Sequence, residues 1–326
     1  MQASLPEKLQ KAKAAPTLVT PGRESERWAQ WQQLTEALEP LLLIPHQCPD
    51  FLGSVTQQAA TLIQLVREDP DLAIFHVVHA MPDQLGHYGV IHAVHTAILV
   101  CLIGQRKGWK SDYTAGAIKA ALTMNLSITA LQNTLAEQTT PLTAEQRDAI
   151  NTHPADSQKL LRRLGVIDEH WLRAVALHHE PHDNKNFPNH VNEVSQWADV
   201  LRTCDVFGAK ISPRITRHGI LSVHAAEAIF RQRSSGYFGA TIIRELALYP
   251  PGCMVRLCSG ETAIVLRRTR SPMRPEVSIL TDTRGRALAQ PLRCMTGTGL
   301  GRSVLVAVAD VDLATRFSPE QLFSNN

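Results

Sequence analysis

Residues 178–188 read HHEPHDNKNFP, and this stretch guides the interpretation of the whole chain. The residues before it predict a helix, and Asp168 can cap the N-terminus of that helix because a carboxylate accepts hydrogen bonds from free backbone amides. His178 and His179 are therefore expected near the end of the helix. Two neighbouring imidazoles are candidate metal ligands, so further ligands are expected elsewhere in the chain.

Imidazole and carboxylate side chains recur on both sides of this histidine pair. His153 precedes Pro154, which predicts a helix start, while His92 falls on a long apolar helix and Asp205 follows downstream. Such side chains bind iron, manganese or zinc, and in helical bundles they project inward from facing helices. The sequence thus predicts a transition-metal site drawn from five residues: His92, His153, His178, His179 and Asp205. The alternative is that no metal binds and that the histidines are hydrogen-bonded within a helical core.

The residues around these candidates favour a mainly α fold. From about residue 88 to 245 apolar side chains recur at helical spacing, and Thr143 and Gln146 have the arrangement of a capping box. Upstream, helices are expected over residues 28–43, 51–67 and 72–79. The polar candidates therefore lie in a helical domain that follows an N-terminal helical region.

After residue 247 the pattern changes to short β-type runs separated by turns. The expected strands cover residues 254–257, 262–266, 277–280 and 304–308. The chain is accordingly divided into a flexible leader (1–24), an N-terminal helical region (25–87), a helical domain (88–246) and a small β-rich domain (247–326).

Composition restricts the possible functions only weakly. The formal net charge of +3 does not imply nucleic-acid binding, and the six scattered cysteines suit a reducing compartment. No export signal is visible at the N-terminus, and the apolar stretch near residues 90–104 is shorter than the ~20 residues of a membrane span. A cytoplasmic protein without a membrane partner is expected.

Several motifs together resemble the HD-GYP branch of the HD phosphohydrolase superfamily, which opens cyclic di-GMP. Residues 178–188 resemble its HHE-x-x-DGxGYP segment, residues 142–145 with His153 and Pro154 resemble "LTxxE...HP", and residues 204–217 resemble "ADxxDALxxxRxxR". The resemblance covers roughly residues 88 to 245. It implies the helical bundle of that superfamily, with the five candidates as metal ligands and with four further contacts to a ligand: Glu180, Asp183, Arg214 and Arg217.

The chain departs from this family at its defining motif. The family's HDIGK segment corresponds to residues 124–128, where Met124 and Asn125 replace the catalytic pair and Ile128 replaces the lysine. In the family the missing aspartate bridges two metal ions, whereas a neutral asparagine carbonyl cannot balance two cations and a thioether is a poor ligand for a hard metal. By resemblance, His153, His178 and His179 ligate one metal, so a site with a single metal remains compatible with the sequence.

Three functions follow as hypotheses. The sequence favours a catalytically impaired HD-GYP-like signalling module, which binds cyclic di-GMP or a signalling protein and has no catalytic residues of its own. The first alternative is an active metal-dependent phosphohydrolase with an altered metal site. The second is nucleic-acid binding through basic residues of the β-rich domain: Arg267, Arg268, Arg270 and Arg274. A homodimer is compatible with each of them.

Overall fold

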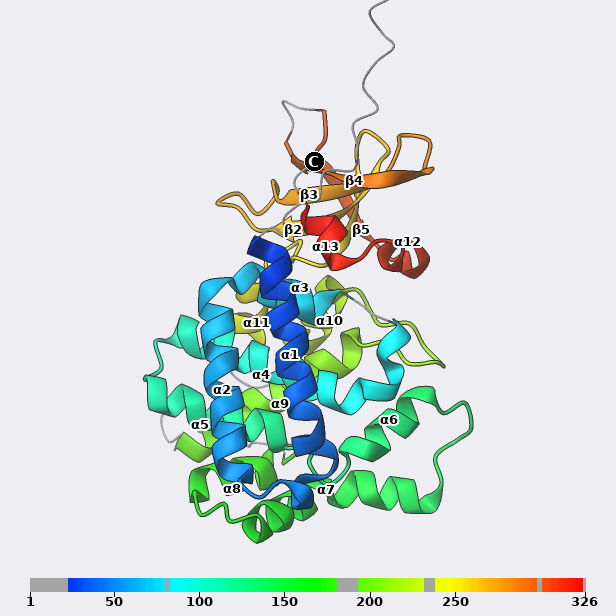
Figure 1. Ribbon diagram of the computed structural model, residues 1–326. Coiled ribbons are helices and arrows are strands. Elements are labelled where there is room, and N and C mark those ends of the chain that lie inside the picture. Colours follow the sequence, from blue (N-terminus) through cyan, green and yellow to red (C-terminus); the bar gives the residue numbers. More distant parts are fainter. Residues whose placement is uncertain (1–22, 80–81, 181–192, 232–237, 298–300, 325–326) are drawn as a thin grey trace, which may run out of the picture.

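The computed structural model describes residues 23–79, 82–180, 193–231, 238–297 and 301–324. The first part of the chain forms three helices, α1 (Arg23–Leu43), α2 (Phe51–Glu68) and α3 (Pro70–Val78), with a short 3-10 helix η1 (Pro45–Gln47) between the first two. These helices agree with the ranges expected from apolar spacing. Figure 1 shows α1 and α2 side by side on one face of the molecule.

The central helix of the fold is α4 (Tyr88–Lys107), which follows the 3-10 helix η2 (Pro82–His87). It packs against helices of the N-terminal region and against the helices that follow it: α5 (Ser111–Thr123), α6 (Thr129–Glu137), α9 (Glu193–Ile211) and α11 (Gly239–Leu246). The remaining helices of this part are α7 (Ala144–Arg163), α8 (Glu169–Leu177) and α10 (Ser222–Arg231). Although α4 is long and apolar enough to cross a membrane, most of its surface is covered by these neighbours. It is therefore the core helix of the bundle.

Glycine allows α4 and α6 to approach closely beside the predicted metal site. The amide of Gly89 donates a 2.7 Å hydrogen bond to Asn133 Oδ1, and a Cβ at this position would lie 2.4 Å from the carbonyl oxygen of Thr129. Because that oxygen belongs to the backbone, the two helices would have to separate to accept a larger residue.

Gly89→Ala is accordingly expected to lower the free energy of unfolding by about 1–3 kcal/mol, as overpacking in a core usually does. Urea denaturation followed by circular dichroism measures this change. Gly86→Ala is the matched control, because its Cβ would meet the nearest atom at an ordinary 3.5 Å. Equal stability of the two variants would contradict this account of the contact.

The C-terminal part is a five-stranded antiparallel sheet with the strand order β4-β3-β2-β1-β5. Its strands are β1 (Met254–Leu257), β2 (Thr262–Arg267), β3 (Glu276–Thr281), β4 (Ala287–Met295) and β5 (Val304–Val308). Four of them match the expected runs. The strand β4 was not predicted, because it has a largely exposed, polar pattern and contains Pro291, which is tolerated at a sheet edge where no amide proton is needed for pairing.

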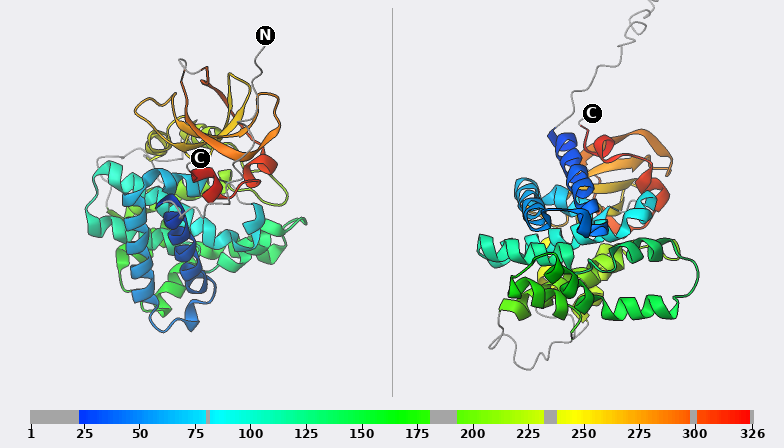
Figure 2. Two further views of the ribbon diagram at one scale, coloured as in Figure 1. Left: turned by 45° about the horizontal axis from the view of Figure 1, so that its top comes forward. Right: turned by 60° about the horizontal axis from the view of Figure 1, so that its bottom comes forward.

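Two short helices, α12 (Val311–Thr315) and α13 (Pro319–Phe323), follow the sheet and were also not expected. Figures 1 and 2 show the sheet resting on one end of the helical part, with α13 returning toward α1. The ring of Phe323 in α13 packs edge-on against Phe75 in α3, with ring centroids 4.9 Å apart. The sheet and the helices thus share apolar contacts.

One buried carboxylate joins the sheet to the N-terminal helices. Asp69 accepts hydrogen bonds from Arg27 of α1 at 3.1 Å and from two nitrogens of Arg267 in β2 at 3.0 Å each. Its other role is local, since the same carboxylate caps α3 by accepting from the amide of Leu72. Next to it, Asp71 pairs with Arg268. The five side chains form a polar joint between segments that are distant in sequence.

Candidate metal centre

His153 is held in position by the proline that follows it. The structure places both residues inside α7, so the expectation that Pro154 begins a helix is wrong. Proline has no amide proton and therefore leaves the carbonyl of Ile150, four residues earlier, without its helical partner. His153 Nδ1 donates to this carbonyl at 2.6 Å. The His-Pro pair thus fixes the direction of the imidazole within a continuous helix.

His178 is oriented by a second free carbonyl, at the end of α8. Asp168 caps the start of this helix as expected, accepting from the amides of His170 and Trp171. The last carbonyls of a helix have no helical partners, and His178 Nδ1 donates to one of them, that of Val175, at 2.6 Å. Both histidines therefore carry a proton on Nδ1 and a lone pair on Nε2 when they are neutral.

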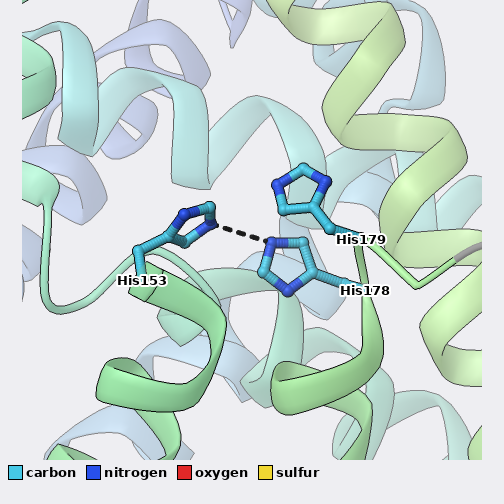
Figure 3. Close-up of side chains that lie close together, drawn as sticks. All are labelled: His153, His178 and His179. Atoms are coloured by element: carbon cyan, nitrogen blue, oxygen red, sulfur yellow. Dashed lines mark hydrogen bonds between the residues drawn. The ribbon is translucent and has the colours of Figure 1, made fainter. Parts of the chain in front are cut away.

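These two lone pairs point at each other. Figure 3 shows His153 and His178 with their Nε2 atoms facing, 3.2 Å apart, and with His179 beside them. Two acceptors at this distance attract each other only if a proton or another cation lies between them. Burial lowers the pKa of His178 to about 3, aided by the neighbouring His179, and burial also lowers the pKa of His153. A proton is thus disfavoured, and the same group of donor atoms could hold a metal cation.

The set of donor atoms fits such a cation. The ligand atoms of His153, His178 and His179 all lie within 4.8 Å of one another, and His179 supplies the solvent-exposed side of the group. Zinc held at about 2.0–2.1 Å by imidazoles places neighbouring donors roughly 3.4 Å apart in a tetrahedron. The 3.2 Å separation of the two Nε2 atoms is close to this value. We call these three residues the histidine trio.

The other two predicted ligands, His92 and Asp205, are hydrogen-bonded to each other. His92 in α4 donates from Nε2 to Asp205 Oδ1 in α9 at 2.7 Å. Burial raises the pKa of Asp205. The hydrogen bond from His92 and the nearby His178 and His179 lower this pKa by more than burial raises it, so the net shift is downward. The carboxylate is consequently an anion next to the trio, with Oδ1 paired to His92 Nε2, while His92 Nδ1 has no hydrogen-bond partner among the described residues.

Met124 and Asn125 lie in a turn between α5 and α6. Met124 is fully buried in the apolar core, and Asn125 is 6% exposed. Two residues later, Ser127 Oγ contacts Ser157 Oγ at 3.0 Å and donates to the carbonyl of His153 at 3.2 Å. The turn is thus tied to α7 by serine hydroxyls, in the region where the family pattern has its glycine and lysine.

The predicted ligand contacts are dispersed. Arg214 follows α9 and places its guanidinium 5.3 Å above the ring of Tyr88, while Arg217 donates to the carbonyl of Ala209. The side chain of Glu180 is exposed next to the trio. Asp183 lies outside the described residues. None of these positions is tested by a bound ligand, so their role as ligand contacts stays a prediction.

Tyr88 also contributes to the site, although it was not among the predicted site residues. Its ring stacks on that of His92, with centroids 5.8 Å apart and an interplanar angle of 5°. The available signal was its position four residues before His92, which places both side chains on one face of a helix. Tyr88 therefore lies between a predicted metal ligand and a predicted ligand-binding arginine.

Comparisons with known proteins agree with this geometry. A cyclic di-GMP phosphodiesterase of Pseudomonas aeruginosa is 25% identical over 207 residues, which are 61% of this chain and 49% of that protein. The chain thus spans about half the length of the curated relative that it matches. No solved structure matches the chain. The family model of the HD domain matches residues 79–242, which are half of the chain. This range includes the trio and the His92–Asp205 pair. The chain therefore belongs to the HD domain family.

Proposed function

We propose that this chain is a signalling module of the HD domain family that has lost hydrolysis and acts by binding. In this proposal the histidine trio holds one divalent transition metal, and the surrounding surface binds cyclic di-GMP or a signalling protein. The observation that carries the proposal is the 2.7 Å hydrogen bond between His92 Nε2 and Asp205 Oδ1, which engages one ligand atom of each of these two residues.

The residues at positions 124 and 125 support the same conclusion. A second metal would also require donors from this turn, where Met124 is enclosed in the apolar core and Asn125 offers only a neutral amide. Two-metal hydrolysis depends on a carboxylate that bridges the ions and on a hydroxide formed between them. The chain has no such carboxylate at the matching position.

Cyclic di-GMP is proposed as the ligand because the curated relative is a cyclic di-GMP phosphodiesterase. The contacts proposed for it are Glu180, Asp183, Arg214 and Arg217. We also propose a cytoplasmic location, a homodimer and the division of the chain into four parts. Size-exclusion chromatography with light scattering would test the oligomeric state.

A second candidate is a working phosphohydrolase with one metal. It is favoured by the trio itself, since three imidazoles leave a coordination position open, as in catalytic zinc sites. When bound there, a metal supplies Lewis acidity and an activated water. Nucleic-acid binding is less well supported, because Arg267 and Arg268 of the basic run are paired with Asp69 and Asp71.

His178→Ala is expected to weaken metal binding by about 100-fold or more, because it removes a ligand and not merely a group that orients one. The protein is prepared anaerobically with ferrous iron, and metal content is measured by mass spectrometry. We expect about one metal per wild-type chain and almost none in the variant. His170→Ala is the control, since His170 is an exposed histidine at the start of α8 and lies outside the trio.

The same samples separate the two candidate functions. We expect cyclic di-GMP to bind in calorimetry and to remain intact after prolonged incubation with the metal-loaded protein. Linearisation by the wild type, lost in His178→Ala, would instead establish the phosphohydrolase. A wild-type protein without metal would show that the trio is a hydrogen-bonded group within the core.

A further inference from the structure

A cavity of about 670 Å³ lies where the sheet meets the helices, apart from the histidine trio. Its walls come from the C-terminal part of α4, from the end of α11 and the residues after it, from the first turn of α3, and from the segment that joins β2 to β3. None of the five predicted metal ligands lines it. Cavities of this size are typical of sites for small organic molecules.

The charged groups that the cavity presents are mainly positive. Three arginines line it, Arg106, Arg244 and Arg268, together with two carboxylates, Asp71 and Glu245. The side chains of these two carboxylates are only 16% and 10% exposed. By contrast, the side chain of Arg106 is 47% exposed, and Arg244 is also an exposed residue. A ligand that enters the cavity therefore meets guanidinium groups before it meets carboxylates.

Two of these arginines are held in place by contacts that leave some of their donors free. Arg268 donates from Nε to Asp71 at 2.5 Å and from Nη1 to the backbone carbonyl of Glu245 at the end of α11. Arg106 pairs with the carboxylate of Glu245 through Nε. A guanidinium carries five N–H donors, so these contacts do not use all of them. Side chains that are already ordered lose little conformational entropy when they bind an anion.

The third arginine, Arg244, has no carboxylate partner within the described part of the chain. Two further arginines, Arg270 and Arg274, are exposed on the segment that joins β2 to β3. Their neighbours in sequence line the cavity, so both add positive charge near its rim. The cavity thus has an unpaired cation in its wall and an excess of positive charge around it, which favours an anionic ligand.

The remaining wall suits an organic group. Tyr249 is partly exposed in the cavity and Pro272 adds an exposed apolar face. An aromatic side chain packs well against a planar ring, whereas an arginine binds a phosphate group through two parallel N–H donors. Inorganic phosphate alone would satisfy the arginines but would leave much of the 670 Å³ unfilled.

We propose that this cavity binds a small organic molecule that carries a phosphate group, with the phosphate on the three arginines and the organic part against Tyr249. A small molecule is favoured over nucleic acid because the arginines line a hollow, whereas a nucleic-acid strand needs a basic surface that follows several phosphates. The site shares no residue with the histidine trio and does not depend on a metal there.

Three probes separate the two parts of this ligand: adenosine monophosphate, adenosine and inorganic phosphate. Ligand-observed NMR with the full-length protein is expected to give a dissociation constant of about 1 mM or tighter for the monophosphate. Adenosine lacks the charged group and inorganic phosphate lacks the ring, so each is expected to bind at least ~10-fold more weakly. No binding of the monophosphate, or equally tight binding of either fragment, would overturn the proposal.

A variant of the unpaired arginine locates the binding. Arg244→Gln removes one guanidinium without breaking an ion pair and is expected to weaken binding of the monophosphate by ~10-fold or more. Arg284→Gln is the matched control, because Arg284 is also exposed but lies between β3 and β4 and does not line the cavity. Each variant is first checked for a native circular dichroism spectrum. Equal weakening by both would show that phosphate binds positive surface in general, as nucleic acid would, and would refute the proposed site.

The trio variant His178→Ala distinguishes this site from that of the proposed function. It is expected to bind the monophosphate as the wild type does, because no residue of the trio lines the cavity. Loss of binding in His178→Ala, with unchanged binding in Arg244→Gln, would place the phosphate at the trio and would overturn the proposal.

Discussion

Asp69→Ala is expected to lower the free energy of unfolding by about 3–5 kcal/mol, the usual cost of removing one partner from a buried ion pair. The wild-type carboxylate is 4% exposed and balances two arginines, Arg27 and Arg267, which are themselves largely covered. In the variant both cations would remain near the joint without a counter-charge, and α3 would lose its cap. Urea denaturation at pH 7 measures the loss.

Two control variants test whether the loss of stability comes from the buried charge of Asp69. Asp69→Asn keeps a capping oxygen but not the charge, so its stability should lie between those of the wild type and the alanine variant. Glu169→Ala breaks the ion pair with Arg162, in which both side chains are about half exposed, and should cost about 1 kcal/mol or less. Similar losses for Asp69→Ala and Glu169→Ala would show that the joint behaves as a surface ion pair.

Lowering the pH from 7 to 5 is expected to cost on the order of 3 kcal/mol of stability through two histidines, His76 in α3 and His79 directly after it. Burial lowers the pKa of each from 6.5 to about 4, and for His76 the neighbouring His79 adds to this effect. The unfolded chain therefore takes up protons below pH 6.5 that the folded chain refuses until about pH 4. Stability is full above this window and falls as the pH decreases through it.

Other groups do not reverse this trend. The pKa of His95 is also lowered by burial, so His95 acts in the same direction. Burial raises the pKa of Asp69, but the hydrogen bonds from Arg267 and Leu72 lower this pKa by more, so the net shift is downward. The stability that Asp69 contributes is therefore lost only in stronger acid. Urea denaturation between pH 5 and 7 with a chelator present measures the slope without a metal contribution.

Neutral replacements identify which histidines cause the dependence of stability on pH. His76→Phe and His79→Phe should each flatten the dependence of stability on pH, whereas His46→Gln, at an exposed position in η1, serves as the control. A dependence that is unchanged in both phenylalanine variants would mean that the two imidazoles titrate equally in the folded and unfolded states.

Much of the candidate site could be predicted because its residues stand in short local patterns. The adjacent histidines at 178 and 179 follow a helix whose start Asp168 caps, and the resemblance of these segments to a known family implied the packing that brings His153 to them. The predicted helix start at Pro154 is wrong, although proline often marks such a start. Within α7 it instead frees the carbonyl that orients His153.

The parts that escaped prediction depend on contacts between distant segments. His92 and Asp205 are separated by 113 residues, and nothing local to either one shows that they bond to each other. The strand β4 is an edge strand that pairs only with β3, and its largely exposed side chains show little apolar alternation.

The central position of α4 also bears on the order in which the chain assembles during its synthesis. Synthesis proceeds from the N-terminus, so α4 is made before α5, α6, α9 and α11, which cover much of its apolar surface in the finished fold. Until they are made, α1, α2 and α3 are the partners within reach, and all three contact α4 in the final structure. The N-terminal helices can thus cover part of the apolar surface of α4 before the later helices have been made.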